Sequence, residues 1–162
     1  MTNATSASDY SNTYTQFHLQ FIFAPKYRLA LIDRKWAEEL HRYITALVQE
    51  RSHKMLCINS EPDHIHFFIG YRPSESIPDL MERVKSNASR WINDRAKTAV
   101  LFAWQRGYGG FSYRKSDVPQ IIHYILHQQE HHRKVTFLEE YEAMLEEFGV
   151  DYNPLYLFKA PR

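Results

Sequence analysis

Apolar and polar side chains alternate from Tyr14 to Ala24, with phenylalanine or leucine at every second position between residues 17 and 23. Successive side chains of a β-strand point to opposite faces, so this pattern predicts a half-buried strand that ends at Pro25. Apolar residues then recur at helical spacing behind Asp33, a residue type that caps helix starts. An amphipathic helix is therefore predicted over residues 34–51.

The pattern continues with two apolar runs, residues 54–61 and 64–71, which predict a hairpin because only two residues separate them. Ser76 caps a second predicted helix that carries a proline in its first turn. The glycine-interrupted aromatic stretch Trp104–Arg114 predicts a last strand with a bend or bulge. The order βαββαβ indicates an α+β, ferredoxin-like antiparallel sheet with helices on one face, and the other face free for a ligand.

Two helices are predicted after this sheet, one from a cap at Asp117 to about His132 and one from about Thr136 to Phe148. The 162 residues suit a single domain, which we place at residues 14–162 after a flexible tail of residues 1–13. The sequence contains one cysteine and no apolar run long enough to cross a membrane. A cytoplasmic protein without internal disulfides is expected.

Charge is divided unevenly along the chain. Residues 1–134 carry 18 Lys and Arg against 13 Asp and Glu, whereas residues 135–162 carry 2 against 6. A mildly basic body with an acidic C-terminal segment is compatible with a polyanion-binding face, and equally with scattered solvated charge.

Two histidines open the strand predicted at residues 64–71. Side chains two apart on a strand share a face, so His64 and His66 point the same way while Ile65 and Phe67 point to the opposite layer. Two adjacent imidazoles form a ready bidentate metal site. The alternative is a pair of surface histidines without a ligand.

The helix predicted from Asp117 has an apolar face at helical spacing, formed by Val118, Ile121, Ile122, Ile125 and Leu126. Tyr124, Gln128 and His131 lie on a separate stripe, so Tyr124 is not needed for the core. A phenol is a weak nucleophile and needs a cation to stabilise the developing phenolate. The Gln128 amide oxygen could complete a metal site begun by the histidines, and mixed nitrogen and oxygen ligands suit Mg2+ or Mn2+. A surface tyrosine is the alternative.

These motifs together resemble the single-tyrosine HUH transposases of small bacterial insertion sequences, including their REP-associated relatives. The resemblance runs from Tyr14 to about Phe158. Its landmarks are KYR at 26–28, PDHIHFFI at 62–69, VKSNASRW at 84–91, WQRGYGGFS at 104–112 and YILHQQEHH at 124–132. One departure is His127, where many relatives have asparagine.

The resemblance implies that His64 and His66 are metal ligands, that Gln128 is the third ligand, and that Tyr124 is the nucleophile. It implies cleavage of single-stranded DNA with a 5′-phosphotyrosine link and a free 3′ hydroxyl, followed by rejoining. It also implies recognition of hairpins at element ends and a homodimer whose subunits share active sites. No nucleotide cofactor is implied.

DNA binding has separate support from cations near the predicted second helix and last strand, namely Lys85, Arg90, Arg106, Arg114 and Lys115. Unpaired bases could stack on Trp104, Tyr108, Phe111 and Tyr113, unless these aromatic residues belong to the core. Two other functions stay open at this point. One is a non-catalytic single-strand nucleic-acid-binding module, and the other is a metal-dependent hydrolase that uses water and makes Tyr124 incidental.

Overall fold

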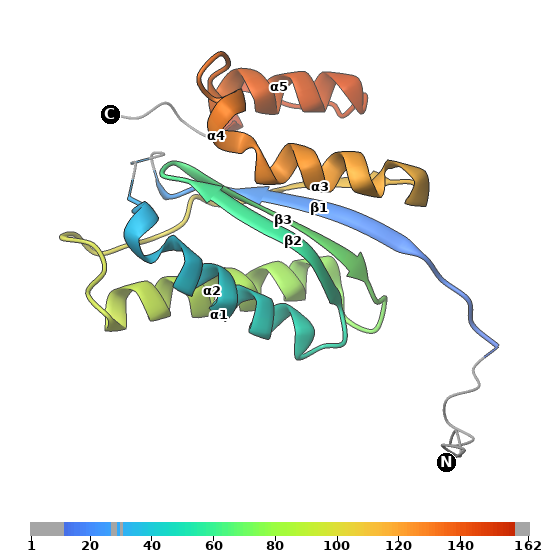
Figure 1. The fold of residues 1–162 in the computed structure, drawn as a ribbon, viewed down its shortest axis with the longest axis horizontal. Helices are drawn as coiled ribbons and strands as arrows, with labels where there is room; N and C mark the ends of the chain where they lie inside the picture. Colours follow the sequence, from blue (N-terminus) through green and yellow to red (C-terminus); the bar gives the residue numbers. More distant parts are fainter. Residues whose placement is uncertain (1–11, 27–28, 30, 158–162) are drawn as a thin grey trace.

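A four-stranded antiparallel sheet in the order β2-β3-β1-β4 forms the centre of the computed structural model, which describes residues 12–26, 29 and 31–157. The strands are β1 (Phe17–Phe23), β2 (Lys54–Glu61), β3 (His64–Tyr71) and β4 (Gly109–Tyr113). Helix α1 (Arg34–Gln49) follows β1 and helix α2 (Ile77–Asp94) follows β3. The predicted ferredoxin-like α+β order is confirmed (Figure 1).

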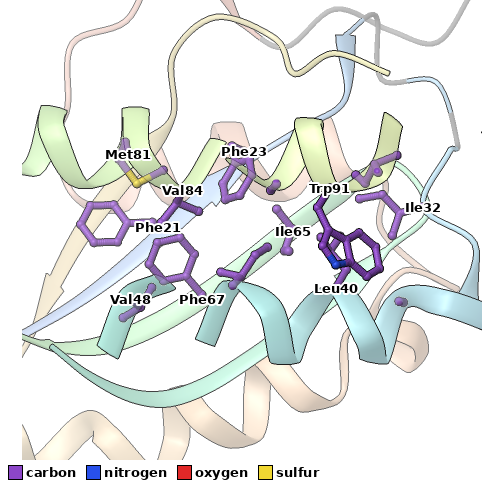
Figure 2. Packing of buried hydrophobic residues seen from close by; sticks show 14 of the residues in the cluster. Phe21, Phe23, Ile32, Leu40, Val48, Ile65, Phe67, Met81, Val84 and Trp91 are labelled. Atoms are coloured by element: carbon purple, nitrogen blue, oxygen red, sulfur yellow. The ribbon is translucent and has the colours of Figure 1, made fainter. Parts of the chain in front are cut away.

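Both α1 and α2 begin at the predicted caps. The Asp33 side chain accepts a hydrogen bond from the Lys35 backbone N–H at 2.8 Å, and Ser76 accepts one from the Asp79 N–H at 3.2 Å. The two helices cover one face of the sheet and bury the alternate side chains of β1 and β3. Figure 2 shows this main core, in which Phe21, Phe23, Ile65 and Phe67 pack against side chains such as Leu40, Val84 and Trp91.

The opposite face of the sheet is covered, so the expectation of a free ligand face is wrong. It carries the turn η3 (Lys115–Asp117) and the helices α3 (Val118–Leu126), α4 (Gln128–His131) and α5 (Phe137–Glu147), as Figure 1 shows. This face also presents apolar side chains, with Phe68 packed against Ile125 and with Ile22 and Phe111 packed against α5. Exposing such side chains to water would cost free energy, and the C-terminal helices avoid this cost by burying them.

Several predicted boundaries change in the structure. The helix predicted from Asp117 to about His132 is interrupted at His127, whose backbone (φ −106°, ψ 25°) separates α3 from α4. Asp117 makes no side-chain cap bond and instead ends the turn η3. Strand β1 is shorter than Tyr14–Ala24, and Trp104 lies outside β4 in an isolated bridge with Pro25. A short 3-10 helix, η4 (Pro154–Tyr156), follows α5.

Some predictions concern the ends of the chain. Residues 1–11 of the predicted tail lie outside the described residues, as do Tyr27 and Arg28 of the KYR motif and Phe158. A single domain over residues 14–162 stays a prediction. Within the described ranges, no helix combines the length and the apolar character needed to cross a membrane.

Candidate active site

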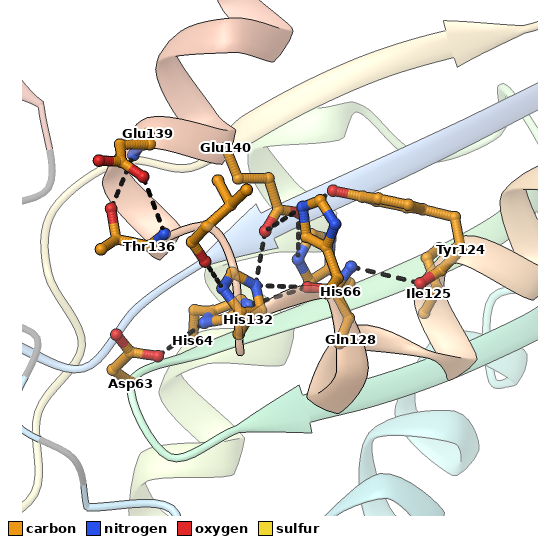
Figure 3. A network of polar contacts seen from close by, with 12 residues as sticks. Asp63, His64, His66, Tyr124, Ile125, Gln128, His132, Thr136, Glu139 and Glu140 are labelled. Atoms are coloured by element: carbon orange, nitrogen blue, oxygen red, sulfur yellow. Dashed lines mark hydrogen bonds and ion pairs between the residues drawn. The ribbon is translucent and has the colours of Figure 1, made fainter.

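His64 and His66 lie at the start of β3 and point to the face covered by α3, α4 and α5 (Figure 3). Both side chains are fully buried, and their ring centroids are 5.0 Å apart. Ile65 and Phe67 pack into the main core on the opposite face. The predicted sharing of one face is confirmed, and the histidines are not exposed surface residues.

The His64 ring is oriented by contacts on both of its nitrogens. Nδ1 lies 2.7 Å from Asp63 Oδ1, so it donates its proton to the carboxylate. Nε2 then presents a lone pair to the Gln128 amide oxygen, 3.3 Å away, which is also an acceptor. Two converging lone pairs are the arrangement that a cation satisfies, and a carboxylate on the far nitrogen is typical of metal-binding histidines.

The His66 ring leaves one nitrogen without a hydrogen bond. Its Nδ1 lies 2.8 Å from the Gln20 amide nitrogen. Among the residues that the structure describes, none makes a hydrogen bond with Nε2, and the carboxylate oxygen Glu140 Oε1 lies 3.5 Å away. Burial lowers the pKa of His66 to about 3, so the ring is neutral, which is the charge state that metal binding by an imidazole requires.

Glu140 is the site residue that the sequence analysis missed. Its side chain is 4% exposed, and it enters from α5, whose start is fixed by a capping box between Thr136 and Glu139. The carboxylate accepts a hydrogen bond from the Tyr124 hydroxyl and lies 2.5 Å from His132 Nε2. Although burial acts to raise the pKa of Glu140, the hydrogen bonds from His132 and Tyr124 lower it to about 2.

Glu140 and the two histidines form a buried group that could hold a metal. One ligand atom from each of His64, His66 and Glu140 lies within 4.8 Å of the others. The unpaired Nε2 of His66 and the converging lone pairs of His64 and Gln128 fit a cation at this position. The donor set of imidazole nitrogen and oxygen suits a divalent ion with open positions.

Tyr124 lies inside the site rather than on an exposed stripe of α3. Its ring is half-buried and meets the His66 ring edge-on, with the centroids 6.3 Å apart. Leu126, expected on the apolar face, is instead 53% exposed. Burial and then the Glu140 charge raise the pKa of Tyr124, so the hydroxyl keeps its proton and needs a cation to react.

Gln128 lies in α4 and its side chain is fully buried. The amide oxygen is 2.7 Å from His132 Nε2 and 3.3 Å from His64 Nε2. The structure therefore brings together all four residues predicted for the site, His64, His66, Tyr124 and Gln128 (Figure 3). The helix break at His127 lies between Tyr124, on α3, and Gln128, on the short α4.

The predicted DNA-binding cations are placed less uniformly. The Lys85 ammonium donates to the carbonyls of Gln105 and Gly107 at 2.7 and 2.8 Å, and burial lowers its pKa to about 8. Lys85 therefore holds the loop before β4 rather than extending into solvent. The other four predicted cations are exposed on the surface: Arg90, Arg106, Arg114 and Lys115.

The aromatic residues near β4 belong to the protein interior. Trp104 and Tyr108 pack against the main core, and their rings contact Phe23 and Phe21 respectively. Phe111 and Tyr113 pack beneath α5. The structure thus favours the core alternative over base stacking for these side chains.

Comparison with known proteins identifies the family. The model of a family described as IS200-like transposases matches residues 13–128, well over half of the chain. The chain belongs to the IS200-like transposase family. The match contains His64, His66, Tyr124 and Gln128, and it ends before Glu140.

Solved structures agree with this transposase in fold. A candidate transposase from Deinococcus radiodurans R1 is 20% identical, with a TM-score of 0.59 over 74% of this chain and 95% of that one. A REP-associated tyrosine transposase bound to a REP hairpin is 15% identical, with a TM-score of 0.58 over 78% of this chain and 74% of that one. No curated protein matches the chain significantly.

Proposed function

We propose that this transposase cleaves and rejoins single-stranded DNA through a covalent bond between the Tyr124 oxygen and a 5′ phosphate, with Mg2+ or Mn2+ held by His64 and His66. One observation carries the proposal. The Tyr124 hydroxyl, from a C-terminal helix, reaches the buried group that contains both strand histidines. Core packing alone gives no reason to bring a phenol, two imidazoles and a carboxylate together.

The side chains have distinct parts in this reaction. His64 and His66 supply imidazole nitrogens, and an oxygen of Gln128 or Glu140 completes the ligand set. When bound, the divalent metal polarises a non-bridging phosphate oxygen and stabilises the charge that develops during displacement. The Tyr124 oxygen forms a bond to phosphorus as the bond to the 3′ oxygen breaks, and the 3′ oxygen leaves as the new strand end. Glu140 Oε1 already accepts the phenol proton in a hydrogen bond and is the group in place to receive it.

The DNA substrate is proposed to contain a hairpin, since the REP-associated tyrosine transposase of similar fold is bound to a REP hairpin. A homodimer with shared sites stays a prediction, as does a cytoplasmic location. Within one chain, the Tyr124 ring lies beside the His66 ring.

The two alternative functions, a DNA-binding module and a hydrolase, require different residues at this site. A non-catalytic binding module would need neither the phenol nor the metal group. A hydrolase that uses water would leave the Tyr124 hydroxyl outside the reaction, which disagrees with its position beside His66 and Glu140. The covalent adduct separates all three, because only the tyrosine mechanism forms one.

Replacing Tyr124 with phenylalanine is the decisive experiment. The ring packing is retained, so the fold and DNA affinity should survive, while cleavage and the covalent adduct should vanish. Wild type and variant would be incubated with single-stranded DNA containing candidate element ends and Mg2+ or Mn2+, then run on a denaturing protein gel. Tyr108→Phe is the matched control and should keep the adduct. An adduct on the Tyr124→Phe protein would refute the assignment, and wild-type cleavage without an adduct would favour the hydrolase.

A further inference from the structure

A fully buried amide lies behind His66, on the side away from Glu140. Gln20 is on β1, and neighbouring strands pair with it on both sides, through Phe68 and Phe111. Its amide nitrogen lies 2.8 Å from His66 Nδ1, and its amide oxygen accepts a hydrogen bond from the Tyr113 hydroxyl at 2.8 Å. In the sequence, Gln20 stands between two apolar residues of the strand, and the alternating pattern alone indicates no role for it.

The two histidines differ in the partner of Nδ1, the ring nitrogen on the side away from the metal position. Asp63 is an acceptor and keeps a proton on Nδ1 of His64, which leaves Nε2 of that ring free to bind a metal. The Gln20 amide nitrogen is a donor to Nδ1 of His66. A neutral ring that accepts at Nδ1 carries its proton on Nε2, the nitrogen that faces Glu140. In this tautomer His66 cannot bind a metal through Nε2.

Reversing the Gln20 amide removes this obstacle. A half-turn of the terminal amide exchanges oxygen and nitrogen within the same volume. The oxygen then accepts a proton from Nδ1 of His66, and the NH2 group donates to the Tyr113 oxygen, which is also an acceptor. Both hydrogen bonds survive, no backbone atom needs to move, and Nε2 of His66 gains the lone pair that a ligand requires.

We propose that Gln20, held in place by Tyr113, is a positioning residue that selects the metal-binding tautomer of His66. The inference rests on the proposed function of the site but concerns metal binding rather than the nucleophile. Metal binding through Nε2 of His66 then requires the amide oxygen of Gln20, rather than its nitrogen, to face the ring. In the described part of the chain, no other side chain hydrogen-bonds to His66 Nδ1, so the choice falls to Gln20.

Metal affinity gives the first test, with Mn2+ titrated into the full chain in a calorimeter. Gln20→Leu keeps the size of the side chain but removes the acceptor, and should weaken Mn2+ binding about 10- to 100-fold. Gln20→Glu supplies an oxygen that can only accept, and should bind Mn2+ at least as tightly as wild type. Gln120→Leu, at an exposed position of α3, is the control and should change nothing. Mn2+ binding by Gln20→Leu within twofold of wild type would overturn the proposal.

The ring protons give a second test that a purely structural role would not affect. Nitrogen chemical shifts distinguish the two tautomers of each histidine, and Mg2+ is a suitable diamagnetic probe. The His66 proton should be on Nε2 without metal and on Nδ1 with saturating Mg2+, whereas in Gln20→Glu it should be on Nδ1 in both states. A proton on Nδ1 of His66 in the metal-free wild type would refute the tautomer change. If Gln20→Leu does not fold, the proton position in Gln20→Glu decides: a proton on Nε2 of His66 in that variant without metal would overturn the proposal.

Failure of this inference is distinguishable from failure of the proposed function. Both measurements can be made on Tyr124→Phe protein, because neither needs the phenol oxygen. If the His66 proton moves as expected but the covalent adduct still forms in Tyr124→Phe, the role of Gln20 stands. Only the assignment of Tyr124 as the nucleophile is then refuted.

Discussion

Gly109 of β4 lies beneath the Tyr141 ring of α5, and one added methyl group there tests what holds α5 over the site. A Cβ atom at Gly109 would lie 2.6 Å from Tyr141 Cε2 and 2.8 Å from the hydroxyl oxygen. Carbon atoms in good contact are about 3.5–4.0 Å apart, so the ring or the strand must move by about 1 Å. Gly70→Ala is the matched control, because its Cβ would meet Lys54 Cβ at an ordinary 3.6 Å.

The expected cost of Gly109→Ala is that of overpacking a well-filled interior, about 1–3 kcal/mol. For a chain of this size each kcal/mol lowers the melting temperature by roughly 2–4 °C. Urea unfolding at pH 7 measures the free energy directly. Gly109→Ala combined with Tyr141→Ala should cost less than the sum of the two single changes, because the second change removes the clashing atoms.

The same substitution should reach the active site. Glu140 precedes Tyr141 on α5 and contacts the Tyr124 hydroxyl, so a displaced helix pulls the carboxylate away from its partners. Mn2+ binding should weaken if Glu140 contributes a ligand oxygen. A free energy of unfolding for Gly109→Ala within about 0.5 kcal/mol of that for Gly70→Ala, the usual range for a surface substitution, would contradict the expected overpacking.

Three further outcomes are expected. Metal-free protein should lose stability below about pH 6.5, because the unfolded chain binds a proton at His66 that the folded state, with a pKa of about 3, excludes. In urea unfolding, the slope of wild type against pH should exceed that of His66→Phe by up to about 1.4 kcal/mol per pH unit, and equal slopes would contradict this. Mixed dimers of His64→Ala and Tyr124→Phe subunits should regain DNA cleavage only if active sites are shared, and no recovery leaves sites within one chain. Lys85→Met should lower the melting temperature more than Arg90→Met, because Lys85 holds two carbonyls; equal melting temperatures would contradict this.

The sheet could be predicted in detail because its signals are local. Strands β2 and β3 have the predicted bounds, since Pro62 and Asp63 mark the turn between two apolar runs. The covered second face was missed because β1 reads as one-sided, with His18 and Gln20 among its apolar residues. The sequence of β3 indicates the covered second face more clearly than that of β1. Its apolar residues fall on both faces, a pattern typical of a strand buried on both sides.

Most of the site was also readable. His64 and His66 follow from strand periodicity, and Tyr124 with Gln128 from spacing along one helix. Their meeting depends on how α3 crosses the sheet, which periodicity does not specify. The break at His127 was missed for a similar reason, since apolar spacing carries across a single non-helical residue without interruption.

Glu140 illustrates what sequence can indicate without naming a partner. It lies at i+3 from Phe137 and i−4 from Met144, on the buried face of α5, where a charged residue costs free energy unless it is paired. Its position therefore predicts a partner, although only the folded chain identifies Tyr124 and His132. A divalent metal on two neutral imidazoles would bring two positive charges into a buried site. One negative charge from Glu140 and one from the scissile phosphate would balance them, so a carboxylate beyond the family match suits the chemistry of the residues within it.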